Sequence, residues 1–261
     1  MHELVLENIS TYYGKNPVLH NLTLRFHEGT IVGIIGPNGA GKSTLGRVIA
    51  GLKETHGRVI WTETSITSSQ SKTVTPELVS YLFQNPNVTL FAKTILDEFK
   101  IGINIPSDKL EAILTIFGLL KYKDHHPRSL SRGEKQRLCL ALAVARQNQI
   151  LVLDEPFSGV DSSQKQRLLS YLIQLKNEGK TIILISHDLS LLLDHCDRVI
   201  GLVEGRVRFD GQPKDLLVGS FLSDLDFRMP LFYFLLHQYQ GTTIPSSIAL
   251  EKDWKEWLLL Q

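Results

Sequence analysis

The chain has 261 residues, of which 43% are hydrophobic and 21% charged, and its formal net charge is +1. This length allows one large domain, or one domain with an appendage, and the composition is that of an ordinary globular protein. The near-neutral charge argues against bulk attraction to nucleic acid, so we expect no nucleic-acid partner. No apolar run approaches the roughly 18 residues of a membrane span, so we expect membrane contact only through a partner protein.

The first half of the chain predicts a β-rich start followed by loop and helical segments. Apolar patterns predict strands at residues 4–6, 22–26, 31–35 and 57–61. The strand at 31–35 is apolar throughout, whereas the other three are typical of an antiparallel β layer. We expect residues 62–76, which are rich in Ser and Thr, to form a loop. Residues 77–130 carry mixed helical patterns that break at Pro86, Pro106 and Pro127.

The second half alternates helical patterns with short apolar runs. We expect helices starting at Ser131 and covering 168–175, strands at 150–153 and 181–185, and a hairpin formed by 199–203 and 206–209. Alternating buried strands and helices predict an α/β fold with a mostly parallel sheet covered on both faces. Ligands of such sheets bind beyond the carboxyl ends of the strands.

A glycine-rich loop between the strand at 31–35 and a helical pattern is the strongest functional signal. Its sequence, Gly-Pro-Asn-Gly-Ala-Gly-Lys-Ser-Thr at residues 36–44, fits the phosphate-binding pattern G-x-x-x-x-G-K-[ST] in full. Glycines let consecutive N–H groups point at an anion, and the helix N-terminus behind them adds partial positive charge. We expect Lys42 to reach the β and γ phosphates of a nucleotide and Ser43 to bind Mg²⁺. The nucleotide-binding residues predicted here are Asn38, Gly39, Ala40, Gly41, Lys42, Ser43 and Thr44.

Two adjacent acids follow the apolar run at 150–153. Asp154 and Glu155 stand at the predicted carboxyl end of this strand. Behind a phosphate-binding loop, such a pair is typical of a Walker B segment. We expect Asp154 to hold Mg²⁺ and Glu155 to act as the general base that polarises the attacking water.

The segment Leu-Ser-Arg-Gly-Glu-Lys-Gln-Arg, residues 130–137, precedes these acids. Ser131 and Glu134 have the spacing of a capping box at a helix start. The segment also resembles the L-S-G-G-Q signature of ABC-transporter ATPases, with matches at Ser131 and Gly133 and departures at Arg132 and Glu134. The resemblance implies that Ser131, Gly133 and the helix N-terminus contact ATP bound to a second ATPase subunit.

Further segments resemble the remaining elements of that family in the same order. Tyr13 resembles the aromatic residue that stacks on adenine, with Tyr12 as a competing assignment. Gln84 resembles the glutamine that senses Mg²⁺ and the attacking water, residues 158–161 resemble the D-loop at the dimer interface, and His187 resembles the histidine that contacts the γ-phosphate. The implied catalytic residues are therefore Glu155, His187, Gln84 and Lys42, and the implied metal-binding residues are Ser43, Gln84 and Asp154.

A narrower resemblance concerns residues 83–98. Phe-Gln-Asn-Pro, followed by Leu-Phe, Thr-Ile and two acids, is similar to the stretch that docks the membrane subunit in energy-coupling-factor (ECF) and cobalt-type importer ATPases. The resemblance implies an ABC ATPase domain at 1–217, with a RecA-like parallel sheet, an antiparallel β layer and a helical subdomain at about 86–148. Residues 218–261 resemble a short C-terminal extension that pairs two ATPases.

The resemblance implies an ATPase that uses ATP and Mg²⁺ to power a vitamin or transition-metal importer. Its partners would be a second ABC ATPase subunit, identical or paralogous, a transmembrane coupling subunit and a substrate-binding membrane subunit. It would work at the cytoplasmic face of the cell membrane. Three alternatives stay open: an ATPase of another transporter class, a non-transport ABC ATPase, and a nucleotide-binding regulator with weak hydrolysis.

Overall fold

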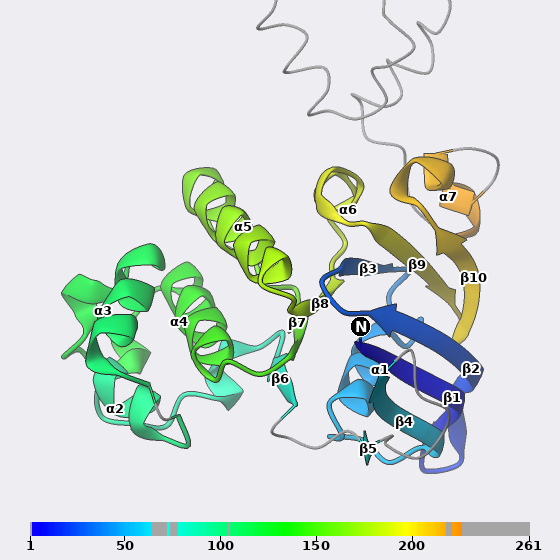
Figure 1. Cartoon of the computed structure of the whole chain (residues 1–261), viewed down its shortest axis with the longest axis horizontal. Helices are drawn as coiled ribbons and strands as arrows, with labels where there is room; N and C mark the ends of the chain where they lie inside the picture. The colour runs from blue at the N-terminus through cyan, green and yellow to red at the C-terminus, as the bar shows by residue number, and fades with distance from the viewer. Residues whose placement is uncertain (1, 64–71, 74–77, 104, 218–220, 226–261) are drawn as a thin grey trace, which may run out of the picture.

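The computed structural model describes residues 2–63, 72–73, 78–103, 105–217 and 221–225. It contains a six-stranded and a four-stranded sheet, with helices on the faces of the larger one (Figure 1). Most of the predicted C-terminal extension, 226–261, lies outside the described residues.

The larger sheet has the strand order β10-β9-β3-β8-β7-β6. These strands are β3 (Ile31–Ile35), β6 (Val79–Leu82), β7 (Ile150–Asp154), β8 (Thr181–Ile185), β9 (Arg198–Val203) and β10 (Arg206–Gly211). All neighbouring pairs are parallel except β9 with β10, which form the predicted hairpin. The central strands are fully buried, as their apolar runs predict.

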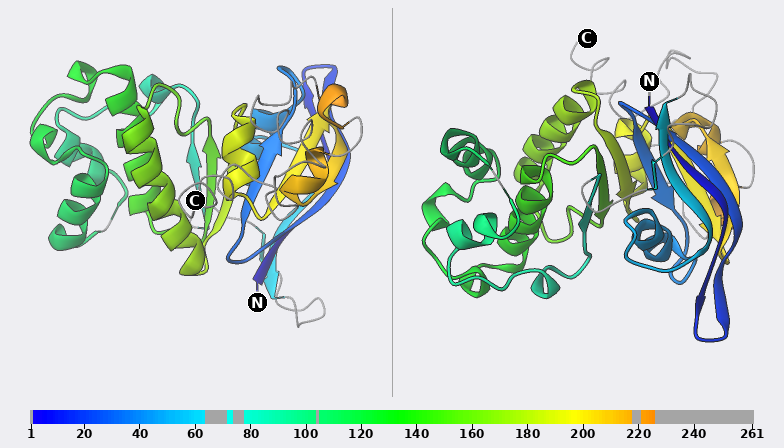
Figure 2. Two further views of the ribbon diagram at one scale, coloured as in Figure 1. Left: turned by 90° about the horizontal axis from the view of Figure 1, so that it is seen from above. Right: turned by 60° about the horizontal axis from the view of Figure 1, so that its bottom comes forward.

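The smaller sheet is antiparallel and has the order β2-β1-β4-β5. Its strands are β1 (His2–Tyr13), β2 (Asn16–His27), β4 (His56–Glu63) and β5 (Lys72–Thr73). This sheet forms the predicted β layer beside the larger sheet (Figure 2). The loop prediction for residues 62–76 is wrong at 62–63, which belong to β4, and at 72–73, which form β5 and pair with β4.

Side chains alternate between two hydrophobic cores on opposite faces of the larger sheet. Leu151 and Leu153 of β7 point into a core formed with the helices on one face. Their neighbour Val152 packs into the core formed with α1 (Lys42–Ile49) and the β layer. The same alternation holds in β8, so the prediction of a sheet covered on both faces is confirmed.

Helices fill the connections between the strands. After α1, the chain forms α2 (Ile95–Lys100), α3 (Ser107–Ile116), α4 (Arg132–Ala145), α5 (Ser162–Asn177), α6 (Leu189–His195) and α7 (Phe221–Asp224). Short 3₁₀ turns are η1 (Pro86–Val88), η2 (Leu120–Tyr122), η3 (Pro127–Ser129) and η4 (Pro213–Leu217). The helices α2, α3 and α4 gather on the side of the sheet away from the β layer (Figure 1).

Strand β6 is the main correction to the sequence-based prediction. Residues 79–82 were expected in a region of helical patterns, but they pair in parallel with β7 from Val79↔Ile150 to Leu82↔Leu153. Four residues, Val-Ser-Tyr-Leu, are too few to show a period, and the partner strand lies far along the chain. Only the tertiary pairing makes this segment a strand.

Phe26 offers a direct test of the core between the β layer and α1. Its side chain is fully buried in β2. We expect Phe26→Ala to lower the free energy of unfolding by about 3–5 kcal/mol, because it removes buried area and leaves a cavity. Denaturant titration measures this change. Leu52→Ala, at a side chain that is 53% exposed, is the control and should change it by less than about 0.5 kcal/mol. Equal losses in both variants would contradict this core assignment.

Candidate nucleotide-binding site

The carboxyl ends of β3, β7 and β8 meet at one edge of the larger sheet and line a cleft of about 640 Å³. Parallel pairing brings these ends together although they are far apart in sequence. The cleft is lined by Val18, Asn38, Gly39, Gly41, Lys42, Ser43, Thr44, Gln84, Asp154, Glu155 and His187.

The loop between β3 and α1 needs glycine at two positions for steric reasons. Gly36 has φ +151°, and a Cβ there would lie 2.1 Å from the carbonyl oxygen of Leu202. Gly41 has φ +99°, and a Cβ there would lie 2.8 Å from a methyl group of Leu19. Gly41 is also the N-cap of α1, which therefore starts without a capping side chain. The first N–H groups of α1 are thus left for an anionic ligand.

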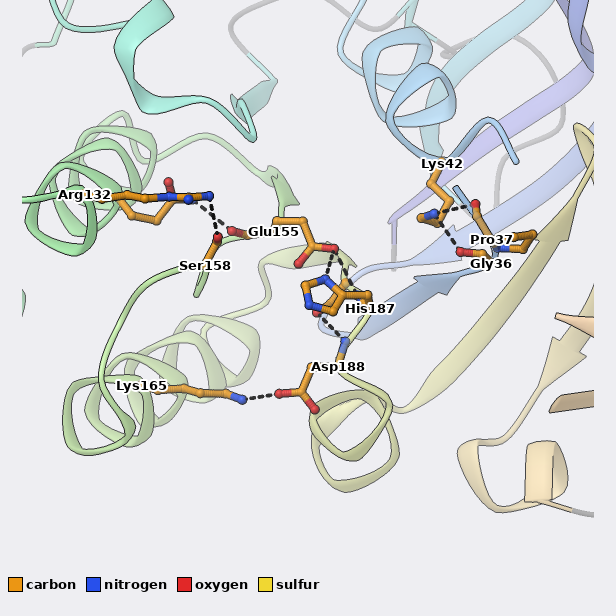
Figure 3. Close-up of polar contacts among 11 residues, drawn as sticks. Gly36, Pro37, Lys42, Arg132, Glu155, Ser158, Lys165, His187 and Asp188 are labelled. Atoms are coloured by element: carbon orange, nitrogen blue, oxygen red, sulfur yellow. Dashed lines mark hydrogen bonds and ion pairs between the residues drawn. The ribbon is translucent and has the colours of Figure 1, made fainter. Parts of the chain in front are cut away.

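Lys42 is the cation of this loop. Its Nζ donates to the carbonyl oxygens of Gly36 at 2.7 Å and Pro37 at 2.9 Å (Figure 3). Burial lowers the pKa of Lys42, while the charges of Glu155 and Asp154 act to raise it. A partly desolvated ammonium group at a helix start suits a triphosphate better than a neutral ligand.

Asp154 is held by a tyrosine that the sequence did not single out. Asp154 is 2% exposed, and its carboxylate accepts a hydrogen bond of 3.1 Å from the Tyr81 hydroxyl. Burial and the charge of Asp154 raise the pKa of Tyr81, so the phenol stays protonated as a donor. The Tyr81 hydroxyl also lies 3.4 Å from the backbone oxygen of Ser43. Tyr81 therefore ties β6 to both β7 and the start of α1.

The donor set of the cleft fits Mg²⁺. The hydroxyl of Ser43, the carboxylate of Asp154 and the amide oxygen of Gln84 are hard oxygen ligands, and all three residues line the same cleft. Bound Mg²⁺ would offset negative charge on phosphate oxygens beside Lys42.

Glu155 and His187 contact each other directly. The Glu155 Oε1 atom accepts hydrogen bonds from the His187 backbone N–H at 3.0 Å and lies 2.8 Å from His187 Nδ1 (Figure 3). The Glu155 side chain is 12% exposed, whereas that of His187 is 77% exposed. The Glu155 side chain is thus mostly buried and held by His187, while the His187 ring is exposed to solvent.

The loop that carries His187 is anchored on its other side. Asp188 caps α6 by accepting from Leu191 N at 3.0 Å and forms an ion pair with Lys165 of α5 (Figure 3). Burial acts to raise the pKa of Asp188, but the hydrogen bond from Lys165 lowers it overall. Lys165 and Asp188 were not singled out in the sequence.

The structure does not bring every predicted site residue to the cleft. Tyr13 lies at the end of β1, where its hydroxyl accepts from Arg47 at 3.3 Å and Lys53 Nζ lies 4.2 Å from its ring centroid. Tyr12 instead contacts the His56 ring edge-on at 5.8 Å. Both tyrosines are more than two fifths exposed, and neither lines the cleft.

The segment with Ser131 and Gly133 also lies away from the cleft of its own chain. Ser131 and Glu134 form the predicted capping box at the start of α4, with bonds of 3.3 and 2.8 Å. A Cβ at Gly133 would lie 2.3 Å from the carbonyl oxygen of Gly159, so only glycine fits. Arg132 donates to Ser158 at 3.2 Å (Figure 3).

The comparisons with known proteins agree on a family. The ABC transporter family profile matches residues 19–158. A protein of Pyrococcus furiosus, provisionally named as an ABC transporter ATP-binding protein, is 35% identical over 94% of this chain and 93% of its own length. The chain belongs to the ABC transporter ATP-binding family. As a member of this family it binds ATP and hydrolyses it.

Other relatives are longer than this chain. A similarly named protein of Methanosarcina mazei is 32% identical over 90% of the chain, which spans only 41% of that relative. The chain also spans 39% of the length of each of two further relatives, from Streptococcus pneumoniae and Bacillus cereus.

Solved structures confirm the ABC ATPase fold. The cbiO1 protein of Clostridium perfringens, part of the ABC transporter complex cbiONQ, has a TM-score of 0.68 at 25% identity and covers 90% of this chain and 98% of its own. A bacterial Atm1-family ABC exporter with ATP bound has a TM-score of 0.73 at 26% identity, covering 85% of this chain and 41% of its own.

In the described part of the chain, no helix is both long and apolar enough to cross a bilayer.

Lys42→Ala tests whether the glycine loop holds the triphosphate. We expect it to weaken ATP binding at least about tenfold, because it removes the ammonium group beside the loop. Isothermal titration calorimetry measures the dissociation constant. Lys180→Ala is a matched control, since Lys180 also donates to a backbone oxygen, that of Gln147 at 2.7 Å, and burial also lowers its pKa. Unchanged ATP affinity in the Lys42 variant would contradict the phosphate assignment.

Proposed function

We propose that this chain is the ATP-hydrolysing subunit of an importer of the energy-coupling-factor type, for a vitamin or a transition metal. The observation that carries the proposal is an exposed aromatic residue in the segment that resembles the docking site of those ATPases. Phe91 is 78% exposed and stands between η1 and α2. The likeness to cbiO1 over almost the whole of both chains supports the same class.

The surface around Phe91 suits an apolar segment of a membrane subunit. A hollow of about 360 Å³ lies between β6, α2 and α4, and Phe91 and Ile101 line it. Phe91 and Ala92 donate their backbone N–H groups to Glu98 at 2.5 and 2.7 Å, so the loop has a fixed shape. Glu98 is itself 3% exposed. An exposed aromatic side chain on a rigid loop is typical of an anchor residue at an interface.

The proposal includes a pair of ATPase subunits that face each other head to tail. Ser131 and Gly133 then contact ATP bound at the glycine loop of the partner, which accounts for their distance from the cleft of their own chain. The bound γ-phosphate favours the closed pair of subunits, and the pair opens when hydrolysis removes this phosphate.

In this proposal residues 1–217 are the ATPase domain, about 86–148 its helical subdomain, and 218–261 an extension that helps the pairing. The pair is peripheral, at the cytoplasmic face of the membrane, with a coupling subunit and a substrate-binding subunit as partners.

The proposed mechanism is phosphoryl transfer from ATP to water. Lys42 and the loop amides bind the β and γ phosphates, while Gln84 and His187 orient the water and the γ-phosphate. The water oxygen bonds to the γ-phosphorus as the bond to the bridging oxygen breaks, and ADP leaves with that oxygen. Glu155 accepts the proton that the water loses.

Glu155→Gln tests the general base. The amide keeps the size of the side chain but cannot accept the proton, so we expect ATP binding to persist and hydrolysis to fall about 100-fold or more. Phosphate release under saturating ATP and Mg²⁺ measures the rate. Near-normal turnover would assign the base to another residue.

A second candidate is the ATPase of another ABC transporter class. The Atm1-family exporter, whose ATPase region has a TM-score of 0.73 with this chain, favours it. The two candidates differ in their membrane partners. Isolating the native complex and identifying its membrane subunits decides between them.

Variants of the docking surface test the importer proposal within that complex. We expect Phe91→Ala, and Asp97→Ala at the first of the two acids of the same segment, to reduce recovery of the membrane subunits in a pull-down at least about tenfold while ATP affinity stays unchanged. Glu111→Ala, at an exposed acid on α3, is the control and should leave recovery unchanged. Full recovery with both docking variants would remove the proposed docking surface.

A further inference from the structure

The N-terminal half of α4 is bound to the segment that follows β7. Gln136 lies on the buried face of α4 and is 1% exposed. Its Nε2 atom donates to the backbone oxygen of Glu155 at 2.9 Å. This side chain therefore reaches from the helix that begins at Ser131 to the backbone of the proposed general base.

The backbone of Glu155 needs such support. Its φ of +51° lies in the left-handed region, which residues other than glycine, asparagine and aspartate rarely adopt. Such a conformation persists where surrounding contacts fix it, and it is found most often at functional sites. Glu155 N–H donates to Ile185 at 2.9 Å, and Gln136 binds the carbonyl on the other side of the residue. The same carbonyl oxygen also accepts a hydrogen bond from the Ser158 N–H at 3.2 Å. These bonds hold the peptide groups on both sides of the Glu155 Cα.

Two further contacts join α4 to the same segment. Gly133 packs so closely on Gly159 that a Cβ would meet its carbonyl oxygen at 2.3 Å. Arg132 donates to Ser158 at 3.2 Å. The first turns of α4 and residues 155–159 are thus joined at three points, and Gln136 makes the contact to Glu155 itself.

We propose that Gln136 is a positioning residue for Glu155: it fixes the backbone that aims the carboxylate into the cleft and so transmits the placement of α4 to the hydrolytic step. The inference rests on the proposed role of Glu155 as general base. It assigns to α4 an action on the cleft of its own chain, in addition to its proposed contact with the ATP of a partner.

The test compares binding and turnover in the full chain. We expect Gln136→Ala to lower the turnover number about tenfold with ATP affinity unchanged, because one buried hydrogen bond to the Glu155 backbone is lost. Gln136→Glu keeps the size of the side chain but replaces the donor with an oxygen. It should lower turnover at least as much. Single-turnover hydrolysis of labelled ATP and calorimetric titration measure the two quantities, and thermal unfolding shows that each variant is folded.

Gln149→Ala is the matched control for a structural effect. Gln149 precedes the other end of β7 and donates to the backbone oxygen of Gly179 at 2.8 Å, a bond of the same kind. Its loss should affect stability to a similar degree and leave turnover unchanged. A turnover loss in Gln149→Ala equal to that in either Gln136 variant would overturn the inference.

A double-mutant cycle separates this inference from the base assignment. In a Glu155→Gln background, Gln136→Glu should change the residual rate by less than about twofold, because the carboxylate it positions is gone. An undiminished effect in that background would overturn the inference, as would normal turnover of both Gln136 variants. Normal turnover of Glu155→Gln alone would instead overturn the assigned base.

Discussion

The site depends on parallel pairing of β3, β7 and β8. Because parallel strands end at the same edge, this pairing places the glycine loop, the two acids and His187 around one cleft. Each chemical group comes from a different part of the sequence, and none could act alone. The two hydrophobic cores hold the sheet between helices on one face and α1 with the β layer on the other. Burial of the strands on both faces therefore fixes the geometry of the chemistry at their ends.

The charged groups of the cleft each have a partner within the chain. Lys42 is bound to two carbonyl oxygens, Asp154 to Tyr81 and Glu155 to His187. Unpaired buried charges are costly, so these contacts keep the side chains in defined positions. Under the proposed function, a bound triphosphate would replace these carbonyl contacts of Lys42. Preorganised groups of this kind stabilise developing charge without rearranging during the reaction.

Helix α4 and strand β6 connect this cleft to the hollow near Phe91. Helix α4 contacts residues 155–159 near its N-terminus and lines the hollow near Phe91 with its C-terminal half. Tyr81 of β6 lines the same hollow and also binds Asp154. A displacement at the proposed docking surface thus has two short routes of direct contact to the acids of the cleft. These contacts are the physical connection between the proposed docking surface and the acids of the cleft.

The sequence alone determined the elements whose signals are local. The glycine loop needs fixed residue types at fixed spacing, the capping box at Ser131 lies within one helical turn, and the short apolar run at 150–153 lies in a buried strand. Tertiary structure decided the rest. Strand β6 is set by its pairing with β7, and the contacts of Tyr81 and Gln136 join residues that are far apart in the chain. Such contacts leave no local pattern, because a hydrogen bond between distant segments depends on how the whole chain packs.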